Sequence, residues 1–292
     1  MINYNNRNWL NLFQLKKADT FRRLAPVIIA VGIYSAVVVF VETDWLHLPD
    51  TSPVKQFTML HTLLGFVISM LLVFRTNTAY DRWWEGRKLW GSLINNSRNL
   101  AIKVDAFVPA GDAANRAFFR KIIPLFARAM RKHLLAEATR LELDTEPHPE
   151  IPNFDHTKHL PVQIAGAITN RVQRLYKDGL ISGEQLFFMN AELQSFLDVC
   201  GACERIKNTP IPYSYSSFIK KFIFVYTITL PLGLAFSLHY LLVPVVGFVF
   251  YVLASLELIA EEIEDPFGSD ANDLPMDRMA ETIRKNVEDI IA

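Results

Sequence analysis

The chain contains three long stretches without a charged residue. Residues 24–41 and 56–74 form the first two, and residues 222–256 form a third that is nearly twice as long. Stretches of about 18 or more mostly apolar residues are typical of helices that cross a bilayer. His239 and Pro244 lie in the middle of the third stretch, so we expect two spans there, joined by a tight turn. The pattern predicts four spans.

The polar region between the second and third stretches has the periodicity of helices. No proline or glycine interrupts the pattern between Phe66 and Gly86, so the second span is predicted to continue as one helix to about Phe107. Apolar residues at helical spacing predict further helices over 113–143, 162–176 and 183–206. The predicted fold class is all-α: a four-span transmembrane protein whose long helices continue into a cytosolic helical bundle.

This pattern divides the chain into five segments. They are a cytosolic amphipathic N-terminal segment (1–23), transmembrane spans one and two (24–74), a cytosolic helical region (75–221), spans three and four (222–256) and a cytosolic acidic turn with a helix (257–292).

The distribution of charged residues predicts the orientation of the spans in the membrane. The 292 residues carry 30 basic and 30 acidic side chains, a net charge of +0, which argues against nucleic acid as a partner. Basic residues flank the inner ends of the predicted spans, which places both termini and the middle region inside. Membrane lipid is an expected partner of the spans. These basic residues include Arg22, Arg23, Arg75, Arg82, Lys220 and Lys221.

The second span carries large apolar residues at every fourth position: Phe66, Met70 and Phe74. This spacing places them on roughly one helix face. Such a face commonly contacts lipid or another helix. If several copies of the helix surround one axis, the same residues form apolar rings that gate ion flow by wetting and dewetting.

The segment that follows this span mixes charged and aromatic residues: Arg75, Asp81, Arg82, Trp83 and Trp84. An interfacial aromatic belt with snorkelling arginines explains part of it. Adjacent helical residues point about 100° apart, so at least one of the two tryptophans is expected to pack against protein.

Other candidate chemistry is weaker. The chain has no glycine-rich phosphate loop and no nucleophile or metalloprotease motif, so we predict no enzymatic activity. His148, His156 and His159 gather in a proline-rich segment as a weak metal candidate, and the pair Cys200 and Cys203 is expected to be structural thiols. The acidic stretch from residue 261 to 273 suits either a solvated helix end or a calcium ligand set.

Several of these motifs together resemble the bacterial branch of the bestrophin family. The resemblance rests on Phe74-Arg75 through Arg82-Trp83-Trp84-Glu85, on Pro210-Ile211-Pro212 and on Asp265-Pro266-Phe267-Gly268, in this order. It implies a homopentameric ion channel with one axial pore lined by the second span. Phe66, Met70 and Phe74 would then form the pore neck, with methionine at a ring where the family often carries Phe or Ile.

The resemblance also implies two further sites. Glu262, Asp265, Asp270 and Asp273 match the positions of a calcium clasp in animal members, so calcium is a possible cofactor. A cytosolic constriction is expected near Ile181 and Glu184, where an Ile181 ring would be apolar and a Glu184 ring would favour cations.

The function implied by the resemblance is a passive channel for small inorganic ions in a bacterial inner membrane. Animal relatives conduct chloride and other anions, which favours an anion channel. Two alternatives stay open, a sodium-conducting channel of the same architecture and a coupled transporter, and a membrane-anchored scaffold is a third.

Overall fold

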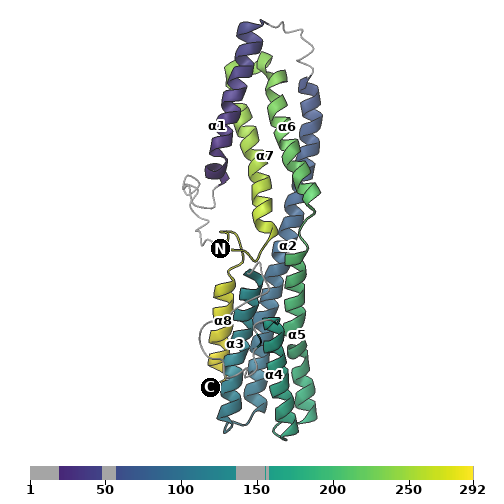
Figure 1. The fold of residues 1–292 in the computed structure, drawn as a ribbon, viewed down its shortest axis with the longest axis vertical. Helices are drawn as coiled ribbons and strands as arrows, with labels where there is room; N and C mark the ends of the chain where they lie inside the picture. Colours follow the sequence, from purple (N-terminus) through teal and green to yellow (C-terminus); the bar gives the residue numbers. More distant parts are fainter. Residues whose placement is uncertain (1–19, 48–56, 136–154, 156–157, 292) are drawn as a thin grey trace. The chain divides into compact units, whose positions relative to one another are not determined.

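The structure, a computed structural model, describes residues 20–47, 57–135, 155 and 158–291 (Figure 1). Every regular element in these ranges is helical, which confirms the all-α prediction. The longer helices are α1 (Thr20–Val39), α2 (Phe57–Phe107), α3 (Ala113–Leu135), α4 (Leu160–Lys177), α5 (Gly183–Asn208), α6 (Tyr213–Leu238), α7 (Leu242–Glu264) and α8 (Met276–Ile290). Two short elements are a π-helix, η2 (Phe40–Trp45), and a 3₁₀ turn, η4 (His239–Leu241).

The predicted continuity of the second span is confirmed, because α2 runs unbroken to Phe107. The third apolar stretch is two helices with a turn between them, also as predicted. His239, the residue after α6, has a φ of +45°, a backbone conformation that is rare outside glycine. The predicted helix over 113–143 is described only as far as Leu135, and the N-terminal segment only from Thr20 onward.

The described chain divides into two compact units. The membrane unit comprises the described residues up to Arg82 and Pro210–Glu264, and the polar unit comprises Trp83–Thr209 and the residues from Asp265 onward. The long helix α2 contributes its first half to the membrane unit and its second half to the polar unit.

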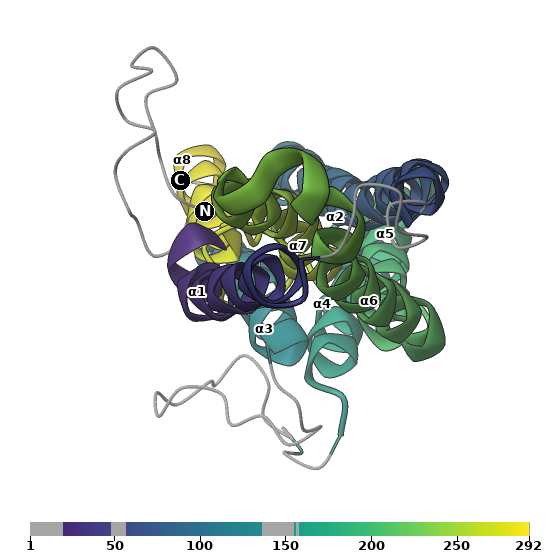
Figure 2. The same cartoon turned by 90° about the horizontal axis from the view of Figure 1, so that it is seen from above.

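In the membrane unit, α1, α6 and α7 pack against one another (Figure 2). Buried apolar residues join the first half of α2 to α6 and α7: Ile68, Leu72, Ile219, Ile223, Phe250 and Leu253. Among the described residues, three helical stretches are long and apolar enough to cross a membrane: Thr20–Trp45, Phe57–Phe107 and Tyr213–Glu264. The last of them contains both α6 and α7. The apolar stretches seen in the sequence are therefore the helices that build this unit.

In the polar unit, α3 packs against α4 and α8, and α4 packs against α5. The core is a single large cluster that includes Trp90 on α2, Phe119 and Phe126 on α3, Phe196 on α5 and Phe267 after α7. The helix α5 begins at a complete capping box, in which Ser182 and Gln185 satisfy each other's backbone N–H groups. This local signal explains why the helix starts at Gly183.

We expect Gly233→Ala to destabilise the membrane unit by about 1–3 kcal/mol, the usual cost of forcing an extra methyl group into a packed site. A Cβ atom at Gly233 would lie 2.9 Å from the backbone nitrogen of Thr58. The Thr58 hydroxyl also donates a hydrogen bond to the Gly233 carbonyl at 3.0 Å, so α2 and α6 cannot separate without losing it. Thermal unfolding in detergent measures the change.

Gly247→Ala is the matched control for this substitution. A Cβ atom there would lie 3.5 Å from Ile28, an ordinary van der Waals distance, so stability should change little. Equal unfolding temperatures for both variants would contradict the close α2–α6 approach.

Candidate pore-lining face and its anchor

One face of α2 is exposed along its whole length in the membrane unit. Phe66, Met70 and Phe74 are 71%, 50% and 54% exposed in the single chain. Met59 and Leu63 lie on the same face, two helical turns before Phe66 and Met70, and are also exposed. These five residues form an apolar stripe that no other described element of the chain covers.

The opposite face of α2 is packed against the rest of the membrane unit. Ile68 and Leu72 are each only 1% exposed and belong to the cluster that joins α2 to α6 and α7. At about 100° per residue, these two positions point away from Met70. Packing within the chain therefore fixes the rotation of α2 and leaves the stripe facing outward.

The apolar stripe becomes polar immediately after Phe74. Asn77 and Asp81 lie seven positions after Met70 and Phe74, on the same helix face, and both are exposed. Asp81 is the first charged residue on this face, because Arg75 points the other way. The exposed face of α2 thus carries the apolar stripe first and then Asn77 and the acidic Asp81.

Arg75 is a buried cation on the packed face of α2. Its side chain is 1% exposed, and its Nη2 donates a hydrogen bond to Oε2 of Glu264 at 2.6 Å. Its Nε lies 3.5 Å from Oε2 of Glu257, whose side chain is 4% exposed. Two carboxylates of α7 therefore lie beside Arg75, one position beyond Phe74.

Glu264, the last residue of α7, joins three segments of the membrane unit. Besides Arg75, its carboxylate accepts a hydrogen bond from the backbone N–H of Ile211 at 2.7 Å. Its backbone carbonyl accepts one from Nε of Arg82 at 2.9 Å. Arg75 and Arg82 are two turns apart on α2, so this anchor holds the segment that follows Phe74.

The two tryptophans separate as their helical directions require. Trp83 packs against the polar core and donates its indole N–H to the carbonyl of Asn272 at 3.0 Å, whereas Trp84 is exposed. The prediction that at least one of them packs against protein is confirmed. Phe267 of the Asp265–Gly268 motif is fully buried beside Gly86, so the two sequence motifs contact each other within the polar unit.

Ile181 and Glu184 lie in different environments at the start of α5. Ile181 is 4% exposed, inside the polar core. Glu184 is exposed in the first turn. The Ser182 hydroxyl donates to Oε2 of Glu184 at 2.7 Å, and this bond together with a backbone hydrogen bond lowers the pKa of that carboxyl. Glu184 is therefore charged at neutral pH.

The four predicted calcium ligands do not all have the same surroundings. Glu262 lies in the membrane unit, where its Oε1 accepts a hydrogen bond from Arg23 at 2.7 Å. Asp265, Asp270 and Asp273 lie in the polar unit. Burial raises the pKa of Asp273 to about 6, and the charges of Asp270 and Asp265 add to the rise.

One atom of this turn suits a cation, because Oδ1 of Asp273 is buried and has no hydrogen-bond partner among the described residues. In those residues, however, three or more ligating side chains converge within 4.8 Å only at His133, His159 and Glu204. Calcium takes six to eight oxygen ligands, so a calcium site at this turn stays a prediction.

Two parts of this arrangement had weak signals in the sequence. Met59 and Leu63 extend the stripe at the same helical spacing as the predicted neck residues. Glu257 is the first charged residue after the third apolar stretch, as Arg75 is after the second. Two opposite charges at the same predicted membrane surface can form an ion pair. Their positions in the sequence could therefore have predicted that Arg75 pairs with Glu257.

Comparison with known proteins gives one consistent result. A family described as Bacterial/Fungal Bestrophin protein matches residues 1–289. A voltage-dependent anion channel-forming protein of Synechocystis is 38% identical over 231 residues, covering 78% of this chain and 75% of the relative. A protein of the same description from Escherichia coli is 30% identical over 281 residues, covering 95% of this chain and 90% of the relative.

Solved structures agree with the sequence matches. A crystal structure of a bacterial bestrophin homologue from Klebsiella pneumoniae aligns with a TM-score of 0.82 and 26% identity. The alignment covers 92% of this chain and 99% of that one.

Proposed function

Because this chain belongs to the bacterial and fungal bestrophin family, we propose that it forms a homopentameric channel for chloride and other small anions. In this proposal, five copies of α2 surround an axial pore. The relatives described as voltage-dependent anion channel-forming proteins support the choice of anions. The proposal also includes a bacterial inner membrane as the location, with both termini and the polar unit on the cytoplasmic side.

The observation that carries the proposal is the exposed stripe on α2. Phe66, Met70 and Phe74 face outward because Ile68 and Leu72 pack inward. Around a shared axis, each of the three becomes a ring of apolar side chains, which water leaves readily when the passage is narrow. The buried Arg75 keeps its charge out of the passage, because it points at α7 and is paired there.

At the cytosolic constriction, the geometry favours Glu184 over Ile181 as the residue that faces the ion path. A side chain that is 4% exposed in the single chain cannot become more exposed when further copies assemble, so Ile181 is poorly placed to form a ring. Glu184 is exposed and charged.

Reversal potentials of the purified protein in planar bilayers test the proposal. Under a potassium chloride gradient, we expect the reversal potential to lie near the chloride equilibrium potential. Native mass spectrometry in mild detergent should give five chains per particle. No conductance for any ion, or particles of one or two chains, would overturn the proposal.

A specific observation favours a second candidate, a cation-conducting channel of the same architecture. Asp81 follows the neck on the exposed face of α2, and Glu184 is exposed in the polar unit. Rings of acidic side chains favour cations in channels. The same bilayer experiment separates the two candidates, because a cation channel reverses near the potassium equilibrium potential.

We expect Asp81→Asn to increase the permeability of chloride relative to potassium. The substitution removes one negative charge per subunit from the entrance that follows Phe74, and the effect should shrink at high salt, where exposed charges are screened. Asp289→Asn on the exposed face of α8 is the control and should leave the ratio unchanged. An unaltered ratio in Asp81→Asn would show that this position does not face the ion path.

A further inference from the structure

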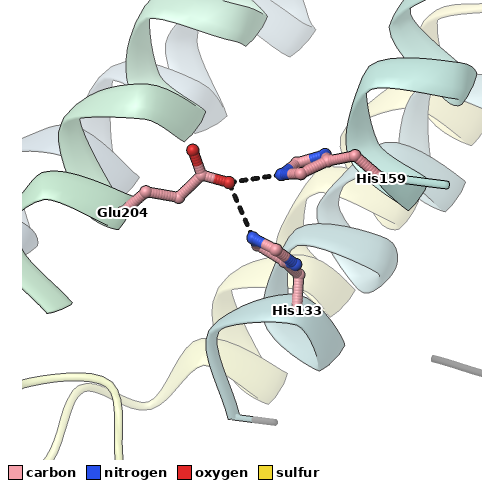
Figure 3. A group of neighbouring side chains, drawn as sticks. All are labelled: His133, His159 and Glu204. Atoms are coloured by element: carbon pink, nitrogen blue, oxygen red, sulfur yellow. Dashed lines mark hydrogen bonds and ion pairs between the residues drawn. The ribbon is translucent and has the colours of Figure 1, made fainter. Parts of the chain in front are cut away.

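Two histidines and one glutamate from three different segments of the chain converge in the polar unit (Figure 3). His133 lies near the end of α3, His159 is the residue before α4, and Glu204 lies on α5. Oε1 of Glu204 lies 2.6 Å from Nε2 of His133 and 2.5 Å from Nε2 of His159. The planes of the two imidazole rings are tilted by 55°, with centroids 4.2 Å apart.

We propose that His133, His159 and Glu204 form a zinc site. Imidazole nitrogen and carboxylate oxygen are standard zinc ligands, and three protein ligands with an open fourth position form a common zinc arrangement. The three ligand atoms lie within 4.8 Å of one another. The site is independent of the pore-lining face, because no residue of the stripe on α2 contributes to it.

A metal ion requires only a small adjustment of these side chains. Ligand atoms on a tetrahedral zinc ion with bonds of about 2.0–2.1 Å are about 3.3 Å apart. In the structure, two imidazole N–H groups instead donate to one carboxylate oxygen at shorter distances. An ion would replace these two protons and lengthen each of the two O···N distances by less than 1 Å, a change that side-chain torsions can supply.

Zinc binding would break one hydrogen bond of His159, and that bond is weak. Nδ1 of His159 accepts a hydrogen bond from the backbone N–H of Val162 at 3.4 Å. With zinc on Nε2, Nδ1 carries the proton and no longer accepts this bond. The distance is longer than that of a typical N–H hydrogen bond, so its loss opposes the ion only slightly.

The protonation states suit metal binding at neutral pH. Burial lowers the pKa of His133, and the neighbouring His159 lowers it further, so its imidazole is neutral and can bind an ion. Burial raises the pKa of Glu204, but the hydrogen bonds that the two histidines donate oppose this rise, and the pKa lies below its ordinary value. An ionised carboxylate beside neutral imidazole is the form that zinc binds.

Cys200 is a candidate for a fourth ligand. It lies one helical turn before Glu204 on α5, with Sγ 3.7 Å from Oε1 of Glu204. Burial raises the pKa of its thiol to about 12, so without an ion it stays protonated. A bound zinc ion deprotonates a coordinating thiol, and otherwise water occupies the open position. The side chains of the three main ligands are 16–31% exposed, so an ion can enter from solvent.

Zinc chloride titration of the full chain tests the proposal. The protein is purified without a histidine tag, stripped with a chelator and studied by calorimetry in detergent. We expect one zinc ion per chain, and an X-ray absorption spectrum of the wild-type complex with the scattering of two imidazoles. Excess calcium chloride should not displace the ion, because calcium prefers oxygen ligands.

Variants then locate the ion. His133→Ala and His159→Ala should each weaken zinc binding by at least the roughly 10–100-fold that loss of an outer-shell partner costs. His47→Ala, at an exposed histidine of the membrane unit, should bind zinc like the wild type. Four results would each overturn the proposal. They are the absence of saturable zinc uptake, a spectrum without imidazole scattering, displacement of zinc by calcium, and unchanged zinc uptake in a variant that carries both His133→Ala and His159→Ala. The wild-type stoichiometry and spectrum decide the question even if a variant fails to fold.

Discussion

Replacing Phe66 and Phe74 together by alanine is expected to raise the chloride current of the purified channel. The two aromatic rings lie on the exposed stripe of α2, one helical turn before and one helical turn after Met70. Smaller side chains widen the neck and reduce its apolar surface, so water fills it more often and the barrier for an ion falls.

The expected increase is at least about tenfold, which corresponds to about 1.4 kcal/mol off the barrier. Macroscopic current per reconstituted protein in planar bilayers or vesicles measures it. Met70 is left in place, because its flexible side chain already adapts to a hydrated neck better than a rigid ring does.

Phe224→Ala with Phe248→Ala is the matched control, because it removes the same two rings from α6 and α7. Both phenylalanines are exposed in the single chain, 63% and 66%, and we assign them to lipid contact. This control should fold and conduct like the wild type. A well-folded Phe66 and Phe74 double variant with unchanged or lower current would refute the assignment of the neck.

Arg75→Met is expected to destabilise the protein by about 3–5 kcal/mol, the usual cost of removing one partner from a buried ion pair. Glu264 would lose its 2.6 Å hydrogen bond from the guanidinium. Glu257 would be left as a buried carboxylate, since neither of its oxygens has a hydrogen-bond partner among the described residues. Unfolding in mixed detergent, followed by circular dichroism, measures the loss.

Arg75→Lys should retain part of the stability. It keeps the charge, but a lysine cannot present several donors in the planar geometry of a guanidinium. Adding Glu257→Gln to Arg75→Met should also recover part of it, because the second substitution removes the uncompensated charge.

Lys220→Met is the control for charge loss in the same unit. Lys220 pairs with Glu261, and both side chains are about half exposed, so the expected cost is at most about 1 kcal/mol. If Arg75→Met cost no more than this control, the two carboxylates would not depend on Arg75.

Much of the fold follows from local patterns in the sequence. The charge-free stretches predicted the helices of the membrane unit, and the absence of helix-breaking residues predicted that α2 continues to Phe107. These features depend on residues near one another in the chain, whose periodicity and backbone preferences act independently of the rest of the fold. The spacing of Phe66, Met70 and Phe74 is likewise a local feature that can be read from the sequence.

Contacts between residues far apart in the chain were harder to predict from the sequence. The sequence grouped His159 with His148 and His156, both of which lie outside the described residues, whereas the structure brings it to His133 and Glu204. Glu204 is 71 positions from His133 and 45 from His159. Which helices meet, and at which turn, depends on how their apolar faces fit together, and periodicity does not specify that fit.

The sequence by itself determined that this chain is helical, that it has apolar spans and that one face of α2 carries a line of large apolar residues. Only the tertiary structure decided that this face points outward, because Ile68 and Leu72 occupy the packed side. It also decided the partners of Arg75, since a buried cation must lie beside carboxylates, and packing brought Glu264, 189 positions away, to that place.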